Sequence, residues 1–375
     1  MTEHPTLSPR LKDALPFWIS LTLIPVVMFA ARAGGAWVWI VPVYAWFMTT
    51  LIDFVMGLNT VNPDPQSPPQ NLFWYRLITL IWFPIQAAVI YGTIYYATHV
   101  ADYGLVELLG LFFGVGVISG TIGIVYAHEL LHQKNRVERW LGDLLLASVL
   151  YSHFRSEHLL VHHRYVGTPR DAVTARYNEG FHRFLPRVLI ECIGSAWAAE
   201  RDMLARKGHG AFHRSNPFWR YGALQLGMLV LAYLVGGWFG VALFALQAFN
   251  AIWQLEVTNY IEHYGLTRKY LGNGKYEHVL PRHSWNASHK ASNWLLINLQ
   301  RHSDHHYKPD RRFPLLQTYS SDEAPQLPFG YTTMGILALC PPLWRRKMNP
   351  RVRAWRRQFY PEITNWTPYN KGTHD

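Results

Sequence analysis

The chain has 375 residues, half of them hydrophobic, yet its mean hydropathy is close to zero. Apolar stretches must therefore be segregated from a strongly polar remainder, as in a protein that crosses a membrane several times. The formal net charge is +11, but the aromatic residues cluster in apolar runs and do not alternate with Lys and Arg. A membrane surface is thus the expected partner of this charge, and nucleic acid is not. The only cysteines, Cys192 and Cys340, stand in unrelated contexts, which excludes a disulfide framework and any Cys-based zinc or iron–sulfur site.

Six apolar stretches predict membrane-spanning helices. In chain order they are Leu15–Ala31, Trp37–Leu58, Phe73–Thr98, Leu105–Ala127, Tyr221–Val235 and Trp238–Val257. Gly residues separate the first two and the last two, as in helical hairpins, and the Pro-rich stretch 59–70 fits neither helix nor strand. Tyr221–Val235 is short for a full span and could be tilted or re-entrant. We therefore predict an all-α polytopic membrane protein with six transmembrane helices, built as one integral-membrane domain over residues 1–375.

The charges predict how the chain is oriented in the membrane. Of the 35 Lys and Arg residues, 14 lie in residues 128–220 and 17 in residues 258–375. Loops rich in Lys and Arg remain on the cytoplasmic side of a membrane. Both polar segments, and with six spans both termini, are thus expected to be cytoplasmic.

Histidines cluster in these polar segments, beginning with His128-Glu-Leu-Leu-His132 at the end of the fourth span. A spacing of four residues places both imidazoles on one face of a helix, where they can bind the same metal. The pentapeptide also fits the His-Glu-x-x-His motif of zinc proteases, with Glu129 as the general base. A membrane zinc protease is therefore an alternative hypothesis.

The second cluster implies more than one metal. His158 and His162 repeat the spacing of four, while His163 follows His162 directly. Adjacent residues on a helix point about 100° apart, so His162 and His163 are expected to serve different ions while His158 pairs with His162. A lone histidine, His263, stands at the end of the sixth predicted span.

The last cluster, with His302, His305 and His306, could also serve two metals, because only His302 and His306 share a helical face. The candidate ligands number nine, namely His128, His132, His158, His162, His163, His263, His302, His305 and His306. Nine imidazoles exceed the four ligands of one zinc and suit two ions, although imidazole alone does not distinguish zinc, copper, iron and nickel. The acidic residues next to these ligands could accept their second ring N–H, and they are Glu129, Glu157, Glu262 and Asp304. A metal site at the membrane boundary, above apolar helices, favours oxidation of an unactivated C–H bond in a hydrocarbon.

The four clusters resemble those of the membrane-bound alkane 1-monooxygenases (AlkB family), which belong to the histidine-rich di-iron hydroxylases and desaturases. The motifs that carry the resemblance most specifically are Asn259-Tyr-Ile-Glu-His263-Tyr-Gly and Leu299-Gln-Arg-His302-Ser-Asp-His305-His306. Arg282-His283-Ser-Trp-Asn286, Thr168-Pro-Arg-Asp171 and Asp53 ahead of Asn62-Pro63 also fit this family.

The resemblance implies that all nine histidines bind two non-haem irons and that no catalytic residue is needed beyond the ligands. It implies O2-dependent hydroxylation of a terminal methyl group, electrons from rubredoxin with its reductase, and a bacterial cytoplasmic (inner) membrane location. His283 joins the candidates for supporting the ligands, and Trp46 and Phe47 are candidates for limiting the length of the substrate channel. The basic stretches Arg345-Arg-Lys347 and Arg351–Arg357 could bind either an acidic electron donor or anionic lipid. A methyl-aromatic (xylene-type) monooxygenase and a fatty-acyl desaturase or hydroxylase are the nearest alternatives.

Overall fold

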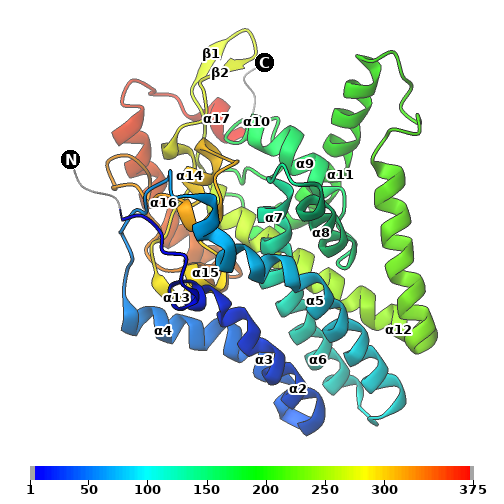
Figure 1. The fold of residues 1–375 in the computed structure, drawn as a ribbon. Helices are drawn as coiled ribbons and strands as arrows, with labels where there is room; N and C mark the ends of the chain where they lie inside the picture. Colours follow the sequence, from blue (N-terminus) through cyan, green and yellow to red (C-terminus); the bar gives the residue numbers. More distant parts are fainter. Residues whose placement is uncertain (1–4, 372–375) are drawn as a thin grey trace.

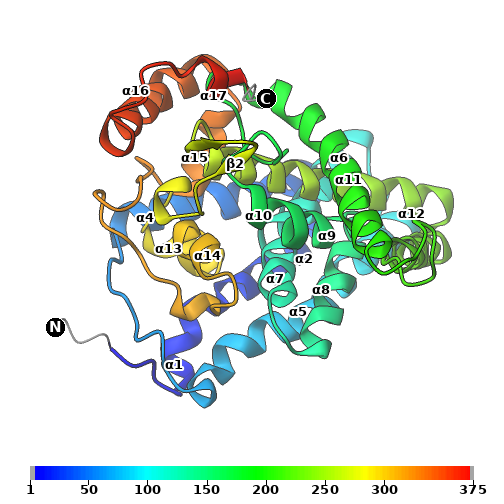
Figure 2. The same cartoon turned by 90° about the horizontal axis from the view of Figure 1, so that it is seen from above.

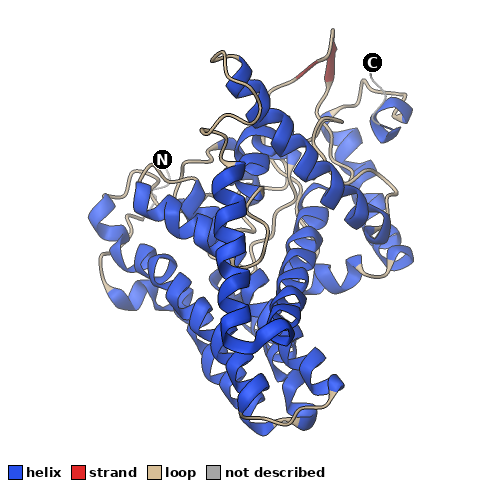
Figure 3. Ribbon diagram, turned by 90° about the vertical axis from the view of Figure 1, so that its right-hand side faces the viewer, coloured by secondary structure: helices blue, strands red, loops and turns tan. Residues whose placement is uncertain are grey.

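The computed structural model describes residues 5–371, and nearly all of their regular structure is helical (Figure 3). Two short strands, β1 (Tyr270–Gly272) and β2 (Lys275–Tyr276), form an antiparallel hairpin. The prediction of an all-α membrane protein is confirmed.

Five continuous helices are long and apolar enough to cross a membrane. They cover Leu11–Ala33, Gly35–Met56, Pro69–His99, Leu105–Leu131 and Phe218–His263. Their parts are α1 (Leu11–Ala14), η1 (Leu15–Thr22), α2 (Leu23–Ala33), η2 (Gly35–Trp39), α3 (Ile40–Pro42), η3 (Val43–Met48), α4 (Thr49–Met56), η4 (Pro69–Leu72), α5 (Phe73–His99), α6 (Leu105–Ile118), η5 (Ser119–Ile124), α7 (Val125–Leu131) and α12 (Phe218–His263).

The last of these helices, α12, consists of two arms that meet at Gly236 and Gly237, where the backbone is not helical. Gly237 has φ of 62°, a conformation that glycine adopts without the steric cost of a side chain. A Cβ atom on Gly240 would lie 2.6 Å from the carbonyl oxygen of Ala232, so glycine also allows the arms to approach closely. Figure 1 shows the two arms meeting in a V. The stretches predicted as the fifth and sixth spans are these two arms.

The helix Leu105–Leu131 lies at the centre of the apolar part. In its most apolar window 83% of the residues are buried, against 22–39% in the other four helices. Glycines bring it close to α12, because a Cβ on Gly116 would lie 2.7 Å from the Gln247 carbonyl oxygen and one on Gly120 2.9 Å from that of Ala251. Close packing of small residues is how helices associate in a membrane, where burial from water gives no driving force. This central helix carries His128 near its end.

The remaining helices gather mainly at the upper end of the spans in Figure 1, which we call the polar end. They are α8 (Arg136–Ala147), α9 (Phe154–Glu157), η6 (His158–His162), α10 (His163–Tyr165), α11 (Phe181–Ala205), η7 (Pro281–His283), α13 (Lys290–Leu295), α14 (His302–Tyr307), η8 (Phe313–Leu315), α15 (Tyr331–Ala338), α16 (Pro341–Phe359) and α17 (Thr367–Lys371). Seen from above, α10 and α14 lie near the centre of this end and α16 at its edge (Figure 2).

Candidate metal centre

The structure brings all nine predicted histidines together in two groups at the polar end of the spans. The five-histidine group contains His128, His132, His158, His163 and His305, and the four-histidine group contains His162, His263, His302 and His306. Within each group, one ligand atom from every residue lies within 4.8 Å of all the others. Each group therefore combines histidines from segments that lie far apart in the sequence.

The spacing between ring nitrogens suits metal coordination. In the five-histidine group, Nε2 of His158 lies 2.9 Å from Nε2 of His132 and 3.0 Å from that of His163, which is 3.1 Å from Nε2 of His305. In the four-histidine group, Nε2 of His302 lies 3.2 Å from that of His263 and 3.0 Å from that of His306. Two nitrogens that bind one metal at about 2.1 Å are separated by about 3.0 Å at a 90° angle and about 3.4 Å at a tetrahedral angle. Separations of 2.9–3.2 Å are therefore compatible with nitrogens that share one metal ion.

Four of these imidazoles, those of His132, His302, His305 and His306, have pKa values shifted toward the neutral state that a metal needs. Burial lowers the pKa of His132 to about 4. Burial first, and then the neighbouring imidazoles, lower the pKa values of His302, His305 and His306 well below 6.5. Neutral imidazoles offer a lone pair to a metal near neutral pH.

A π-helical turn decides how the second cluster is shared between the groups. We predicted that His158 pairs with His162, but the structure places His158 with His163 and His162 in the other group. The segment His158–His162 is the π-helix η6, in which the backbone bonds span five residues instead of four. The wider turn brings residues five apart onto the same side. The expected division of the adjacent pair His162-His163 between two ions agrees with the two groups, and His305-His306 divides in the same way.

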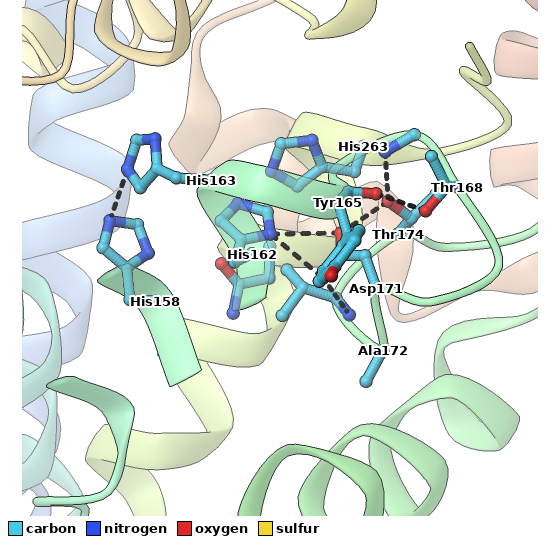
Figure 4. Close-up of polar contacts among 12 residues, drawn as sticks. His158, His162, His163, Tyr165, Thr168, Asp171, Ala172, Thr174 and His263 are labelled. Atoms are coloured by element: carbon cyan, nitrogen blue, oxygen red, sulfur yellow. Dashed lines mark hydrogen bonds and ion pairs between the residues drawn. The ribbon is translucent and has the colours of Figure 1, made fainter. Parts of the chain in front are cut away.

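One carboxylate holds a candidate ligand from behind. Both oxygens of Asp171 lie 3.1 Å from Nδ1 of His162, whose Nε2 faces His306 at 3.2 Å (Figure 4). Thr174 Oγ1 and the Val173 N–H also donate to Asp171, which is only 3% exposed. Burial opposes the charge of Asp171, but His162 and these hydrogen bonds keep its pKa below the usual 3.8. The sequence singled out Asp171 only through the family motif, because nine residues separate it from His162.

A second carboxylate reaches the metal-facing side of a ligand. Oε2 of Glu262 lies 3.2 Å from Nε2 of His302, the same nitrogen that faces His263 and His306. Its other oxygen, Oε1, is buried and has no hydrogen-bond partner among the described residues. Glu262 thus approaches the four-histidine group from inside and does not hold a ring from behind as we expected of it.

The other proposed supporting residues lie elsewhere in the structure. The Glu129 oxygens accept hydrogen bonds from Gln133 Nε2 at 3.1 Å and Phe313 N at 3.2 Å, and none of the described hydrogen bonds joins Glu129 to the nine rings. Asp304 pairs with Arg311 at 2.6 Å and also accepts from Tyr319 Oη. Glu157 is buried, and neither of its oxygens has a hydrogen-bond partner among the described residues. His283 is also buried, and it binds Glu277 and Tyr360 and none of the nine rings among the described hydrogen bonds.

A polar scaffold positions α14 and its three histidines. The Oδ1 of Asn286 accepts a hydrogen bond from the N–H of Ser303 at 2.9 Å, in the first turn of this helix. Arg301, just before α14, donates to the carbonyl oxygens of Leu316 and Asn59. Asp53, near the end of α4, accepts from the N–H of Ser292 in α13. Residues of the family motifs outside the histidine clusters therefore hold the ligand-bearing segments in place.

An apolar cavity reaches both groups from the side of the spans. Its inner end is lined by His128, His158, His162 and His302. Its lining also includes Ile336 of α15, which is 42% exposed, so the cavity reaches the protein surface there, and we call this its mouth. Three π-helices contribute to its wall: η3 supplies Trp46, η5 supplies Gly120, and η6 supplies His158 and His162.

The two aromatic residues proposed for the channel separate in the structure. Trp46 lines the cavity and packs edge-on against Phe113. Phe47 is 58% exposed and is not among the residues that line the cavity. Adjacent residues on a helix face different directions, so only one of the two can face the cavity.

Comparisons with known proteins identify similar chains. The family described as fatty acid desaturase matches residues 104–338. The chain is 39% identical to alkane 1-monooxygenase 2 of Alcanivorax borkumensis over 91% of its own length and 90% of that protein. It is also 39% identical to alkane 1-monooxygenase 2 of Pseudomonas aeruginosa, over 86% of its length and 85% of that protein. The hydroxylase component of the xylene/toluene monooxygenase of Pseudomonas putida is more distant, at 26% identity over 90% of the chain and 89% of that protein.

Proposed function

Because the chain belongs to the alkane 1-monooxygenase family, within the wider fatty acid desaturase family, we propose that it hydroxylates the terminal methyl group of alkanes to give primary alcohols. The reaction takes up O2, two electrons and two protons and releases the alcohol and one water. The observation that carries this proposal is the pair of histidine groups at the inner end of an apolar cavity. A hydrocarbon bound there has one end beside the histidines and the rest of its chain toward the lipid.

We infer that the two groups bind two irons, with His128, His132, His158, His163 and His305 holding one and His162, His263, His302 and His306 the other. The donor set fits, since it is made of imidazoles whose ring nitrogens lie about 3 Å apart and includes a buried Nε2 of His128 with no hydrogen-bond partner among the described residues. When bound, the irons supply the activation of O2, which protein side chains cannot perform alone.

The contribution of the chain is to bind and orient the hydrocarbon. Alkanes offer no polar group, so binding depends on burial, at about 0.8 kcal/mol for each methylene removed from water. Polar side chains in the wall satisfy one another, as when Thr121 Oγ1 donates to Gln254 Oε1, whose amide donates to the Gly116 carbonyl oxygen. Away from the histidine groups, a wall whose polar groups are paired excludes water and allows the terminal methyl of a linear hydrocarbon to reach the histidines first.

We also propose that electrons come from rubredoxin and its reductase and that the polar end faces the cytoplasm across the inner membrane. Cys192 and Cys340 are separated by 148 positions and form no Cys-x-x-Cys pair, which supports a donor site outside these 375 residues. The concentration of Lys and Arg in residues 128–220 and 258–375 supports the orientation.

Aromatic hydrocarbons are the second candidate substrates. The xylene/toluene monooxygenase component is a relative at 26% identity, and the cavity wall includes Trp46, Phe154, Trp253 and Tyr331, which could pack against a ring.

The test uses the purified protein in lipid nanodiscs, loaded with iron and supplied with rubredoxin, its reductase and NADH. We expect about two irons per chain and a 1-alcohol from octane or hexadecane. Methyl hydroxylation of xylene without any product from alkanes would favour the aromatic alternative. Absence of bound iron after reconstitution, or an alkene as the only product, would refute the proposal.

A further inference from the structure

Helix α16 carries a concentration of positive charge that the protein itself does not neutralise. It contains seven Lys or Arg and no Asp or Glu. None of the ion pairs among residues 5–371 includes any of these seven side chains. Surface helices usually carry both acidic and basic residues, which pair with one another. Because α16 has only basic ones, we expect it to bind an anion from outside the chain.

The first two turns of α16 lie level with the end of the last span. The ring of Trp344 packs 5.1 Å from that of Tyr260 and 5.3 Å from that of Tyr264. Tyr260 is three residues, or about 5 Å along the helix axis, from the end of α12 at His263. Arg345, Arg346 and Lys347 follow Trp344 directly, at the level where lipid headgroups surround a helix that leaves the membrane. We call these three residues the basic triplet.

An exposed apolar side chain shares the helical face of Arg346 and Lys347, because Leu343 precedes them by three and four residues in α16. Leu343, in the first turn of α16, is 51% exposed, and Ile336 at the cavity mouth is 42% exposed. Exposed apolar residues followed directly by cations are the pattern of a helix that enters the boundary between hydrocarbon and headgroups. Arg346 is exposed, and Nε of Arg345 is enclosed without a hydrogen-bond partner among the described residues.

We propose that Arg346 and Lys347 of the basic triplet, which share a helical face with Leu343, bind the phosphate of an anionic phospholipid such as phosphatidylglycerol, whose acyl chains lie along Leu343 and Ile336 beside the cavity mouth. Guanidinium and ammonium groups match a phosphate in charge and hydrogen-bonding geometry. This inference concerns lipid recognition and does not depend on the reaction that the protein catalyses.

An acidic protein partner is the competing occupant of this surface. Figure 2 places α16 at the edge of the polar end, while α10 and α14, which carry candidate ligands, lie near its centre. A protein that exchanges electrons with the metal groups should bind close to them, near the centre of the polar end, whereas lipid surrounds the protein at its edge. Continuity with the lipid-facing residues therefore favours the phospholipid.

The test compares two double variants of the full-length protein with equal loss of charge. Arg346→Gln/Lys347→Gln removes two cations of the basic triplet, and Arg353→Gln/Arg357→Gln removes two from the later turns of the same helix. The lipids retained by each protein are counted by native mass spectrometry after exchange into detergent containing phosphatidylglycerol or phosphatidylcholine. At about 1 kcal/mol per cation, the first variant should bind phosphatidylglycerol about thirty-fold more weakly, and the second should match the wild type.

Two further measurements keep the result decisive. Wild-type protein alone should retain phosphatidylglycerol in preference to phosphatidylcholine at low salt and lose that preference at high salt, which requires no folded variant. The proposal is overturned if the wild type shows no preference, or if both double variants lose lipid equally. It is also overturned if Arg346→Gln/Lys347→Gln keeps its lipid but no longer binds an acidic electron-transfer protein, since the surface then serves the protein partner.

Discussion

Replacing Asp171 with Asn should weaken the four-histidine group without disturbing the fold. The substitution preserves the shape of the side chain but removes its charge and turns one of its two acceptor oxygens into an NH2 donor. Thr174 can compensate, because its hydroxyl can rotate to accept a hydrogen bond instead of donating one. The Nδ1–H of His162 has no such freedom and loses the carboxylate that fixes its orientation.

The magnitude follows from the contacts of Asp171. Loss of one hydrogen bond to a charged group costs about 1.5–3 kcal/mol, which corresponds to about a 10- to 100-fold change in an equilibrium constant. Removal of a partner behind a metal-ligating histidine has an effect of the same size. We therefore expect metal affinity, and turnover with it, to fall about 10- to 100-fold in D171N.

The assay measures iron per chain during competition with a chelator, together with the thermal midpoint of the metal-free protein. Thr174→Val is the matched control, since it removes one hydrogen bond to Asp171 and leaves the carboxylate against His162. We expect the control to stay within a few-fold of the wild type and both metal-free variants to unfold near the wild-type temperature. The reasoning is refuted if D171N binds iron as tightly as the wild type, or if T174V loses as much iron as D171N.

Three further predictions test separate parts of the structure. Trp46→Ala enlarges the cavity and should shift the preferred alkane to longer chains. Each added methylene should change the relative kcat/KM by up to about four-fold. As the control, Phe47→Ala alters a side chain that faces outward and should leave the chain-length profile unchanged. His305→Ala and His306→Ala should each remove about one iron per chain, but from different groups, so their Mössbauer spectra should differ from one another; identical spectra would argue against the division between two groups. Glu277, 18% exposed, has its pKa lowered to about 2 because hydrogen bonds from His283 and Tyr360 outweigh the effect of burial. Since this folded pKa lies below the unfolded value, the carboxylate stabilises the protein above about pH 4.5 and loses that effect between about pH 4.5 and 2. E277Q should therefore be less stable than the wild type by about 1–2 kcal/mol at pH 7, by about half of that at pH 3, and nearly equal to it at about pH 2, as measured by thermal midpoints.

The sequence predicted which histidines come together better than how they divide into groups. They stood out because most of them occur in short clusters within the polar segments, and two adjacent pairs already implied two ions. The partner of His158 could not be predicted, because the spacing rule assumed an α-helix and η6 is a π-helix. The local sequence His-Leu-Leu-Val-His carries no signal for the wider turn, which depends on packing against other elements.

Contacts between distant segments were the other limit. Asp304 seemed suited to support a neighbouring histidine, but Arg311 and Tyr319 bind it because the chain folds back over α14. Asp171 approaches His162 through the turn that follows α10, and nothing in the spacing of the two residues indicates this contact. The break in α12, by contrast, could be predicted from the sequence, because Gly236-Gly237 separates two apolar stretches.

The central claim, that this membrane protein inserts one atom of O2 into the terminal methyl of an alkane, is tested most directly by isotope labelling. Iron-loaded protein in nanodiscs is supplied with hexadecane, reduced rubredoxin and 18O2, and the products are analysed by mass spectrometry. We predict 1-hexadecanol carrying one 18O atom, formed by the wild type and lost when His162 or His163 is replaced with alanine. Hexadecene, unlabelled alcohol or no oxygenated product from the iron-loaded protein would contradict the claim.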